Sequence, residues 1–178
     1  MLPKRIKILM YNAFFLSQIN YCILAWGFKI DEIETYQKSI VRIISNSSYS
    51  AHSEPLMKDL NILKLSDIFE LNKTKFYYKY QHHELPEYFQ NFDFKLNSDI
   101  HDHKTRGKEN IHTNKVKRVF ADLCIRNDIA HFINNLSTNI KNKIETHSLR
   151  FILKRFKKEK IKTYNFICNE RNCYSCNN

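Results

Sequence analysis

Residues 31–45 read DEIETYQKSIVRIIS, and this stretch decides the fold class. Its apolar side chains recur at the spacing of one helical face: Ile33, Tyr36, Ile40, Ile43 and Ile44. Asp31 is a suitable N-cap, and Lys38 and Arg42 fall four residues apart on the opposite face. We therefore predict a helix that begins after Asp31 and frays in the polar residues 45–48.

The same helical period continues on both sides of this stretch. Toward the N-terminus it predicts one helix over 3–26, opened by Pro3 and stopped by Gly27. The inward face of that helix would comprise Ile6, Leu9, Met10, Ala13 and Leu16. Toward the C-terminus we expect helices over 53–60, 65–82, 128–136, 138–145 and from 146 or 148 to about 163. The inward face of 65–82 would include Leu65, Ile68, Phe69, Phe76 and Tyr80.

Only two glycines and three prolines punctuate the 178 residues, which disfavours a sheet built on tight turns. The predicted fold class is mostly α, an irregular helical bundle. Short β-like patterns at 111–113 and 119–126 are compatible with a small hairpin. Four regions follow from the patterns: a helical region over 1–83, an irregular connector over 84–118, a region over 119–164 that ends in a basic helix, and a Cys-bearing tail over 165–178.

Positive charge is concentrated in the second half of the chain. The net charge of the whole chain is +11. Residues 91–178 account for most of it, and the excess is highest between 141 and 162. Lys, Ile and Asn together make up a third of the sequence, and their codons are AT-rich, so part of the basicity reflects composition. The position of the charges is therefore more informative than their total.

The terminal basic helix is the strongest binding candidate in the sequence. Its apolar stripe would contain Leu149, Ile152, Leu153 and Phe156. Its cations would be Arg150, Lys154, Lys157 and Lys158, which we predict to contact backbone phosphates of RNA or DNA. Lys38 and Arg42 are secondary candidates for the same contact. A solvated charged face, an anionic membrane surface and a groove on a protein partner are the alternative interpretations.

Cysteine spacing in the tail gives a weaker metal candidate. Cys168, Cys173 and Cys176 supply three thiolates, whereas a closed structural zinc site has four ligands. We therefore interpret the tail as a reduced segment, with zinc as the alternative. The His101-Asp102-His103 triplet has no further ligand nearby in the sequence. Cys22 and Cys124, in apolar surroundings, are predicted to be buried.

The sequence contains no recognisable catalytic constellation. The two glycines cannot form a phosphate-cradling loop, and no Gly-x-Ser-x-Gly elbow occurs. The aromatic run Phe76-Tyr77-Tyr78-Lys79-Tyr80 could stack on bases, but helical packing explains it better. There is no long uncharged apolar run and no secretory leader pattern, so we expect a cytoplasmic or nuclear protein with no membrane partner.

Several short motifs resemble, in order, the C-terminal part of reverse transcriptases from non-LTR retrotransposons of the jockey/RTE type. They are Leu2-Pro3, Tyr11-Asn12, Gln18-Ile19-Asn20-Tyr21-Cys22, Trp26-Gly27, Gln37-Lys38, Arg42-Ile43-Ile44, Ala51-His52-Ser53-Glu54-Pro55-Leu56, Leu60-Asn61-Ile62-Leu63-Lys64-Leu65, Leu85-Pro86-Glu87-Tyr88-Phe89 and His101-Asp102-His103-Lys104-Thr105-Arg106. The resemblance extends from residue 2 to about 164.

This resemblance implies a thumb and post-thumb region of an RNA-directed DNA polymerase encoded by a transposable element. In the family, a preceding palm carries a Tyr-x-Asp-Asp motif that holds two Mg²⁺ ions. No Asp-Asp pair occurs in this sequence, so no catalytic residue and no magnesium site is carried over. The expected role is a fragment that grips the template–primer through its phosphates. The alternative is a helical protein-interaction or scaffold module with incidental basicity.

Overall fold

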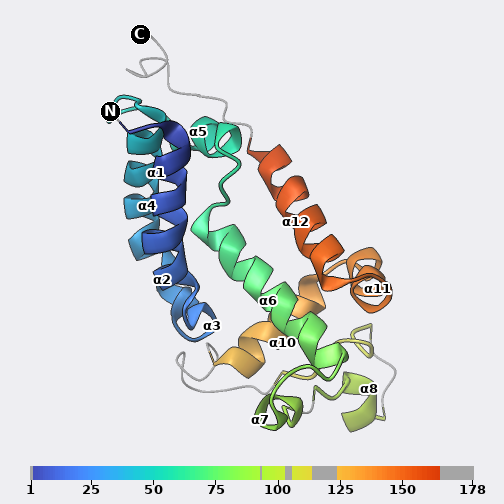
Figure 1. Cartoon of the computed structure of the whole chain (residues 1–178). Helices are drawn as coiled ribbons and strands as arrows, with labels where there is room; N and C mark the ends of the chain where they lie inside the picture. Colours follow the sequence, from blue (N-terminus) through green and yellow to red (C-terminus); the bar gives the residue numbers. More distant parts are fainter. Residues whose placement is uncertain (1, 93, 103–105, 114–123, 165–178) are drawn as a thin grey trace. The chain divides into compact units, whose positions relative to one another are not determined.

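The computed structural model describes residues 2–92, 94–102, 106–113 and 124–164. These residues are mostly helical, and within them the only β pairing is one antiparallel bridge between Leu96 and Ile111. The helices in chain order are α1 (Lys4–Met10), a π-helical turn (Tyr11–Leu16), α2 (Ser17–Asn20), α3 (Ile23–Trp26), a 3₁₀ turn (Gly27–Lys29), α4 (Ile30–Ser45), α5 (Ser53–Asp59), α6 (Leu65–Gln81), α7 (Glu87–Gln90), α8 (Asn97–Ile100), α10 (Ile125–Asn135), α11 (Thr138–Thr146) and α12 (Leu149–Thr163) (Figure 1). The all-α prediction is confirmed.

The chain divides into two compact units. One contains residues 1–69 and the chain from Arg155 onward, and the other contains residues 70–154. The boundary falls within the two long helices α6 and α12. The first unit is therefore assembled from both ends of the chain, whereas the second is continuous in sequence.

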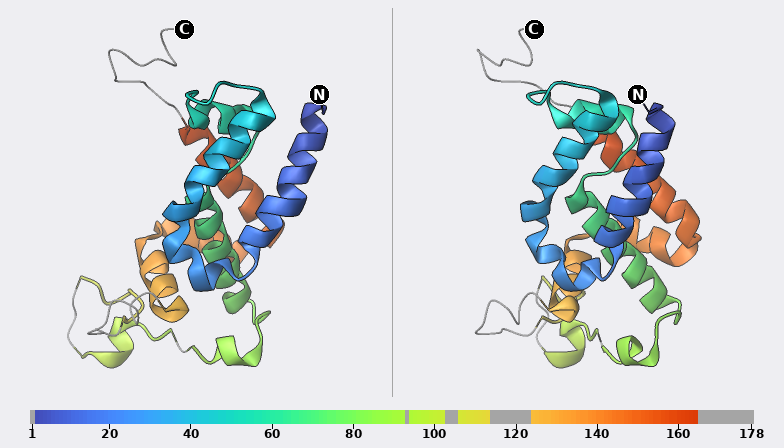
Figure 2. Two further views of the ribbon diagram at one scale, coloured as in Figure 1. Left: turned by 90° about the vertical axis from the view of Figure 1, so that its left-hand side faces the viewer. Right: turned by 60° about the vertical axis from the view of Figure 1, so that its left-hand side comes forward.

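The N-terminal segment is two helical pieces, so the prediction of one helix over 3–26 is wrong. The chain breaks at Tyr21, which is extended, and at Cys22, whose φ of 51° is left-handed. Beyond the break, α3 and the 3₁₀ turn lead into α4, which runs back beside α1 (Figure 2). No glycine or proline marks this break, which is why helical periodicity alone did not reveal it.

The buried side of the N-terminal segment also differs from the prediction. Tyr11 and Ile19 are buried, whereas Ile6, Leu9 and Met10 are 40%, 62% and 44% exposed. The π-helical turn over Tyr11–Leu16 contributes to this difference, because its wider turn shifts the residues that follow relative to those that precede it.

Helix α3 ends at Trp26 with Gly27 as its C-cap residue, where the helix end was predicted, but the φ of Gly27 is −61° and therefore right-handed. Gly27 is buried, and the ring of Phe69 packs against it. A Cβ atom at residue 27 would lie 2.5 Å from the Phe69 Cε2 atom. Glycine is needed at residue 27 because the Phe69 ring of α6 packs directly against the backbone there.

Helix α4 begins two residues earlier than predicted and ends in an ordered cap. Lys29 is its N-cap residue, and Asp31 lies in its first turn. At the other end Asn46 is left-handed with a φ of 54°, and the backbone N–H of Ser47 donates to the Arg42 carbonyl at 3.0 Å. The expected fraying after Ser45 is therefore replaced by a closed helix end.

The face of α4 that packs inward is centred on a polar side chain. Gln37 is fully buried, and its amide donates 2.8 Å hydrogen bonds to the Tyr11 hydroxyl and the Leu63 carbonyl. Its amide oxygen accepts a bond of 3.1 Å from the Leu65 N–H. Because every buried polar group needs a partner, this amide ties three segments of the first unit together. Two residues predicted to face inward, Tyr36 and Ile43, are each 67% exposed.

In the second unit, the C-terminal part of α6 packs on an aromatic cluster. Of the two aromatic residues predicted to face inward, Phe76 is buried and Tyr80 is half-buried, and Tyr77 and Tyr78 are buried as well. Phe89 lies edge-on to Phe76, with ring centroids 5.6 Å apart. The segment predicted as an irregular connector therefore contributes α7, α8 and part of this core.

Helix α10 is joined to α6 and to the connector by side chains. The Lys73 ammonium lies 2.7 Å from the Asp128 carboxylate. The Asn134 side chain accepts from the Ile111 N–H at 2.8 Å and donates to the Ile111 carbonyl at 2.9 Å. Of the suggested hairpin, Ile111 pairs with Leu96, residues 114–123 lie outside the described residues, and residues 125–126 are helical. The hairpin is therefore wrong for residues 125–126.

Cys22 and Cys124 are both exposed, which corrects the prediction that they are buried. Cys22 lies in the break between α2 and α3, and Cys124 is the N-cap residue of α10. Both positions are at the ends of helices.

Among the described residues, no single helix has the length and hydropathy of a membrane span. Two consecutive stretches, Lys4–Asn20 and Ile23–Ser45, reach that length and hydropathy only when taken together, and they are bent by 60°.

Candidate nucleic-acid interface

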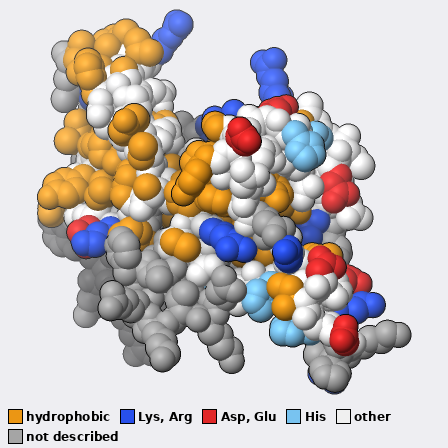
Figure 3. All heavy atoms as spheres, turned by 90° about the horizontal axis from the view of Figure 1, so that it is seen from below, with side chains coloured by type: hydrophobic (Ala, Val, Ile, Leu, Met, Phe, Trp, Pro, Cys, Tyr) orange, Lys and Arg blue, Asp and Glu red, His pale blue; other side chains and the backbone are white. Residues whose placement is uncertain are grey.

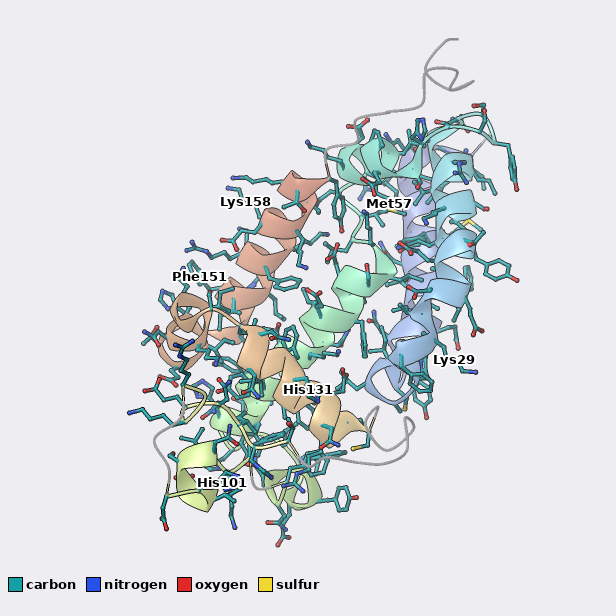
Figure 4. The ribbon with its side chains drawn as sticks, turned by 180° about the vertical axis from the view of Figure 1, so that it is seen from behind. Lys29, Met57, His101, His131, Phe151 and Lys158 are labelled. Atoms are coloured by element: carbon teal, nitrogen blue, oxygen red, sulfur yellow. The ribbon has the colours of Figure 1, made fainter. Side chains whose placement is uncertain are left out.

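The apolar stripe predicted for the terminal helix is the packed side of α12. Ile152 is 7% exposed, and Leu149, Leu153 and Phe156 are half-buried. Arg150, Lys154 and Lys158 are exposed. Figure 4 shows Lys158 and Phe151 on the side of α12 that faces away from α6.

These three exposed cations form a row along one helix. Each is four residues from the next, so successive Cα atoms advance about 6 Å along the axis. None of the three forms an ion pair with any residue that the structure describes. The row therefore offers three solvated positive charges to an extended polyanion.

Three other cations of α12 are in different surroundings, whereas Lys162, four residues after Lys158, is exposed. Lys157 is half-buried, and desolvation lowers the pKa of its ammonium below the usual value. The Arg155 guanidinium lies 2.8 Å from the Glu159 carboxylate, and the Lys160 ammonium lies 2.9 Å from the Asp67 carboxylate. Of the four predicted cations, Lys157 is thus the least accessible to a phosphate.

The C-terminal end of α12 is held by a buried tyrosine. The Tyr164 hydroxyl donates to the Asp67 carboxylate and accepts from the Lys64 backbone N–H at 2.9 Å. Burial and the hydrogen bond to Asp67 raise the pKa of Tyr164 well above its usual value. With the Lys160 ion pair, this contact orients the last turns of the helix, so that the opposite side faces solvent.

An exposed aromatic pair that the sequence analysis did not identify lies at the start of α12, where His147, the C-cap residue of α11, meets Phe151. The rings of His147 and Phe151 stack with centroids 4.7 Å apart and an interplanar angle of 23°. Phe151 is 44% exposed, although its neighbour Ile152 is buried. The available signal was that Phe151 falls outside the apolar stripe, between Arg150 and Lys154.

Lys38 and Arg42 lie on α4 and have local partners. The Lys38 ammonium lies 3.8 Å from the Glu34 carboxylate. The Arg42 side chain donates to the Ala51 carbonyl at 2.7 Å, and its guanidinium lies 5.9 Å from the centre of the Tyr49 ring. Within the described residues, the structure does not join these two side chains to the row on α12.

The metal candidates lie largely outside the described part of the chain. Cys168, Cys173, Cys176 and His103 belong to residues that the structure does not describe, and His101 and Asp102 are exposed. Among the described residues, no group of three or more His, Cys, Asp or Glu side chains could hold a metal ion.

A second surface feature is an apolar groove between the N-terminal helices and α4. It has a volume of about 350 Å³. Its lining consists mainly of Leu2, Met10, Phe14, Phe15, Ile40 and Ile43. Phe14 is 71% exposed, and Figure 3 shows a broad field of hydrophobic side chains over the N-terminal helices. Lys7, whose ammonium donates to the Ile43 carbonyl at 3.1 Å, also lines the groove.

Comparison with protein family models, with curated proteins and with solved structures found no match to this chain.

Proposed function

We propose that this chain is the thumb-like, nucleic-acid-gripping part of a non-LTR retrotransposon reverse transcriptase, without catalysis of its own. The observation that carries the proposal is the exposed row of Arg150, Lys154 and Lys158 on a helix whose other side is packed. Phosphate contacts of this kind position a protein on a nucleic acid without reading its sequence. The ordered motif resemblance supports the same role.

The test is the salt dependence of binding. Replacing Arg150, Lys154 and Lys158 with Gln removes three potential phosphate contacts while keeping good helix-forming residues. The slope of log K against log salt should flatten by about 2 to 3 units, since each phosphate contact contributes about 0.7 to 0.9. Fluorescence anisotropy with labelled RNA and DNA measures this slope.

The matched control removes the same charge elsewhere. Lys4, Arg5 and Lys29 are exposed cations outside α12, and their replacement with Gln lowers the net charge equally. This control variant should retain the parent slope. If the α12 variant binds RNA and DNA as tightly as the parent at every salt concentration, α12 is not the nucleic-acid-binding surface.

The second candidate function, a helical protein-interaction module, is favoured by the apolar groove. Residues 2–30 contain no Asp or Glu, and Lys4, Arg5 and Lys7 lie on the helix that borders the groove. The complementary partner is an amphipathic helix with an apolar face and acidic flanks. Such a peptide should bind the parent, and a Phe14→Asp variant should not bind it, whereas the Gln variant of α12 should.

A further inference from the structure

The exposed ring pair at the start of α12 is held in place before any ligand binds. The Thr146 hydroxyl lies 2.9 Å from the Asn142 carbonyl and 2.7 Å from Nδ1 of His147. The Thr146 hydroxyl donates to the Asn142 carbonyl and also forms a hydrogen bond with the His147 imidazole. The imidazole ring is thereby oriented, and Phe151 stacks against it.

Phe151 is not part of the helix core. The packed side of α12 is formed by Leu149, Ile152, Leu153 and Phe156. Phe151 precedes Ile152 by one step of 100° on the helical wheel and lies opposite the centre of this four-residue stripe, with 44% of its surface exposed. A single exposed phenylalanine is common on protein surfaces, so a binding role for Phe151 must be argued from the residues around it.

Those neighbours are the unpaired cations of the row. Arg150 adjoins Phe151 in sequence, and Lys154 and Lys158 follow it by three and seven residues, which are positions on the same side of the helix. The ring therefore lies among the charges, about 4.5 Å along the axis from Lys154 and about 10.5 Å from Lys158. Flat aromatic surface beside backbone-binding cations is the combination that single-strand binders use.

We infer that this face of α12 binds single-stranded RNA or DNA, with one base stacked on Phe151 and flanking phosphates on Arg150, Lys154 and Lys158. The inference rests on the proposed function and adds the ligand class to it. A base in a duplex is already stacked on both faces, so Phe151 has access only to the bases of single strands and of duplex ends.

The test compares a single strand of about 12 nucleotides with a duplex of the same length, both fluorescently labelled. In a Phe151→Leu variant the residue stays apolar and helix-forming but has no ring. Affinity for the single strand should fall about 5-fold to 150-fold, which corresponds to the loss of one base–aromatic stack. Affinity for the duplex and the salt slope for both ligands should stay at the parent values.

Two further variants make the result specific. Phe14→Leu is the same change at another exposed phenylalanine and should leave both affinities unchanged. Phe151→Trp keeps a stacking ring, so it should retain single-strand binding, and its fluorescence should be quenched by the bound base. Circular dichroism confirms that each variant is as helical as the parent.

The outcomes separate the two proposals. Suppose that Phe151→Leu binds the single strand like the parent and that the Gln variant of α12 shows the flattened slope. The proposed phosphate contacts are then supported, and the stacking inference is wrong. If the Gln variant keeps the parent slope, the proposed function itself fails. Equal loss of single-strand and duplex binding in Phe151→Leu would also contradict the inference.

Discussion

The hydroxyl of Tyr164 donates a hydrogen bond to the carboxylate of Asp67, which lies 97 residues earlier in the chain. The same hydroxyl accepts from the Lys64 backbone, and the same carboxylate binds the Lys160 ammonium. One buried side chain thus connects the end of α12 to the start of α6. The orientation of the last turns of α12, which carry Lys158, depends on this connection.

Replacing Tyr164 with Phe should lower the free energy of unfolding by about 1 to 3 kcal/mol at neutral pH, because a buried carboxylate and a backbone N–H each lose a partner. Urea unfolding measures the change. Tyr49→Phe, at a side chain that is 87% exposed, is the matched control and should change stability little. A Tyr164→Phe variant as stable as the parent would show that the connection contributes nothing.

The same pair predicts an alkaline pH dependence. In the unfolded chain the pKa of Tyr164 is near 10.0, and in the folded chain it is higher. Above pH 10 the unfolded state therefore binds fewer protons than the folded state, and stability falls by about 1.4 kcal/mol per pH unit. Tyr164→Phe lacks this contribution, so the parent's advantage should be constant below pH 10 and shrink above it. An advantage that grows above pH 10 would contradict the assignment.

Gly27→Ala should destabilise the first unit. The added methyl group meets the Phe69 ring, and overpacking of this kind costs about 1 to 3 kcal/mol. The smaller entropic gain of about 0.4 to 1 kcal/mol from replacing glycine does not offset it. In a Phe69→Leu background the penalty should largely disappear. A double-mutant cycle by urea unfolding measures this coupling, and additive effects would argue against the contact.

Cys22→Gly should stabilise the chain by up to about 1 kcal/mol. Cys22 is exposed and left-handed, so glycine relieves strain at a position where little packing is lost. The control is Ala25→Gly in α3, where glycine should instead cost about 1 kcal/mol. Thermal and urea midpoints distinguish the two, and a destabilised Cys22→Gly variant would contradict the strain argument.

The purified chain should carry well under one zinc ion. A closed structural site takes four ligands, and Cys168, Cys173 and Cys176 supply three. Elemental analysis measures the stoichiometry, and Cys173→Ser should leave it unchanged. One zinc per chain that is lost in Cys173→Ser would establish the alternative interpretation of the tail.

Helix positions were predictable from the sequence where the apolar period is regular. The stretches 53–60, 65–82 and 148–163 match α5, α6 and α12 closely. Which face packs was less predictable, as α4 illustrates. Both sides of α4 carry large side chains, and on the buried side Gln37 donates to the Leu63 carbonyl and accepts from the Leu65 N–H. An argument from apolar periodicity counts glutamine as a polar residue and therefore predicts that it is exposed. It cannot take account of hydrogen-bond partners that are distant in the sequence.

The candidate site was predicted in part for the same reason. The apolar stripe of α12 was confirmed because it follows from spacing within one helix. The burial of Lys157 and the ion pair of Lys160 depend on α6 and on how closely the helix packs, which sequence spacing does not specify. The exposure of Phe151 became informative only once Leu149, Ile152, Leu153 and Phe156 were seen to form the packed side.

The division of the first unit between the two ends of the chain affects the order of biosynthesis. At about 5 to 20 residues per second, the ribosome adds Tyr164 roughly 5 to 20 seconds after Phe69. During that interval residues 70–154 are synthesised, and Asp67 and the start of α6 are present without the end of α12. The nascent N-terminal helices therefore expose apolar surface until the end of α12 has been synthesised. This is the stage at which we expect a chaperone to bind the chain.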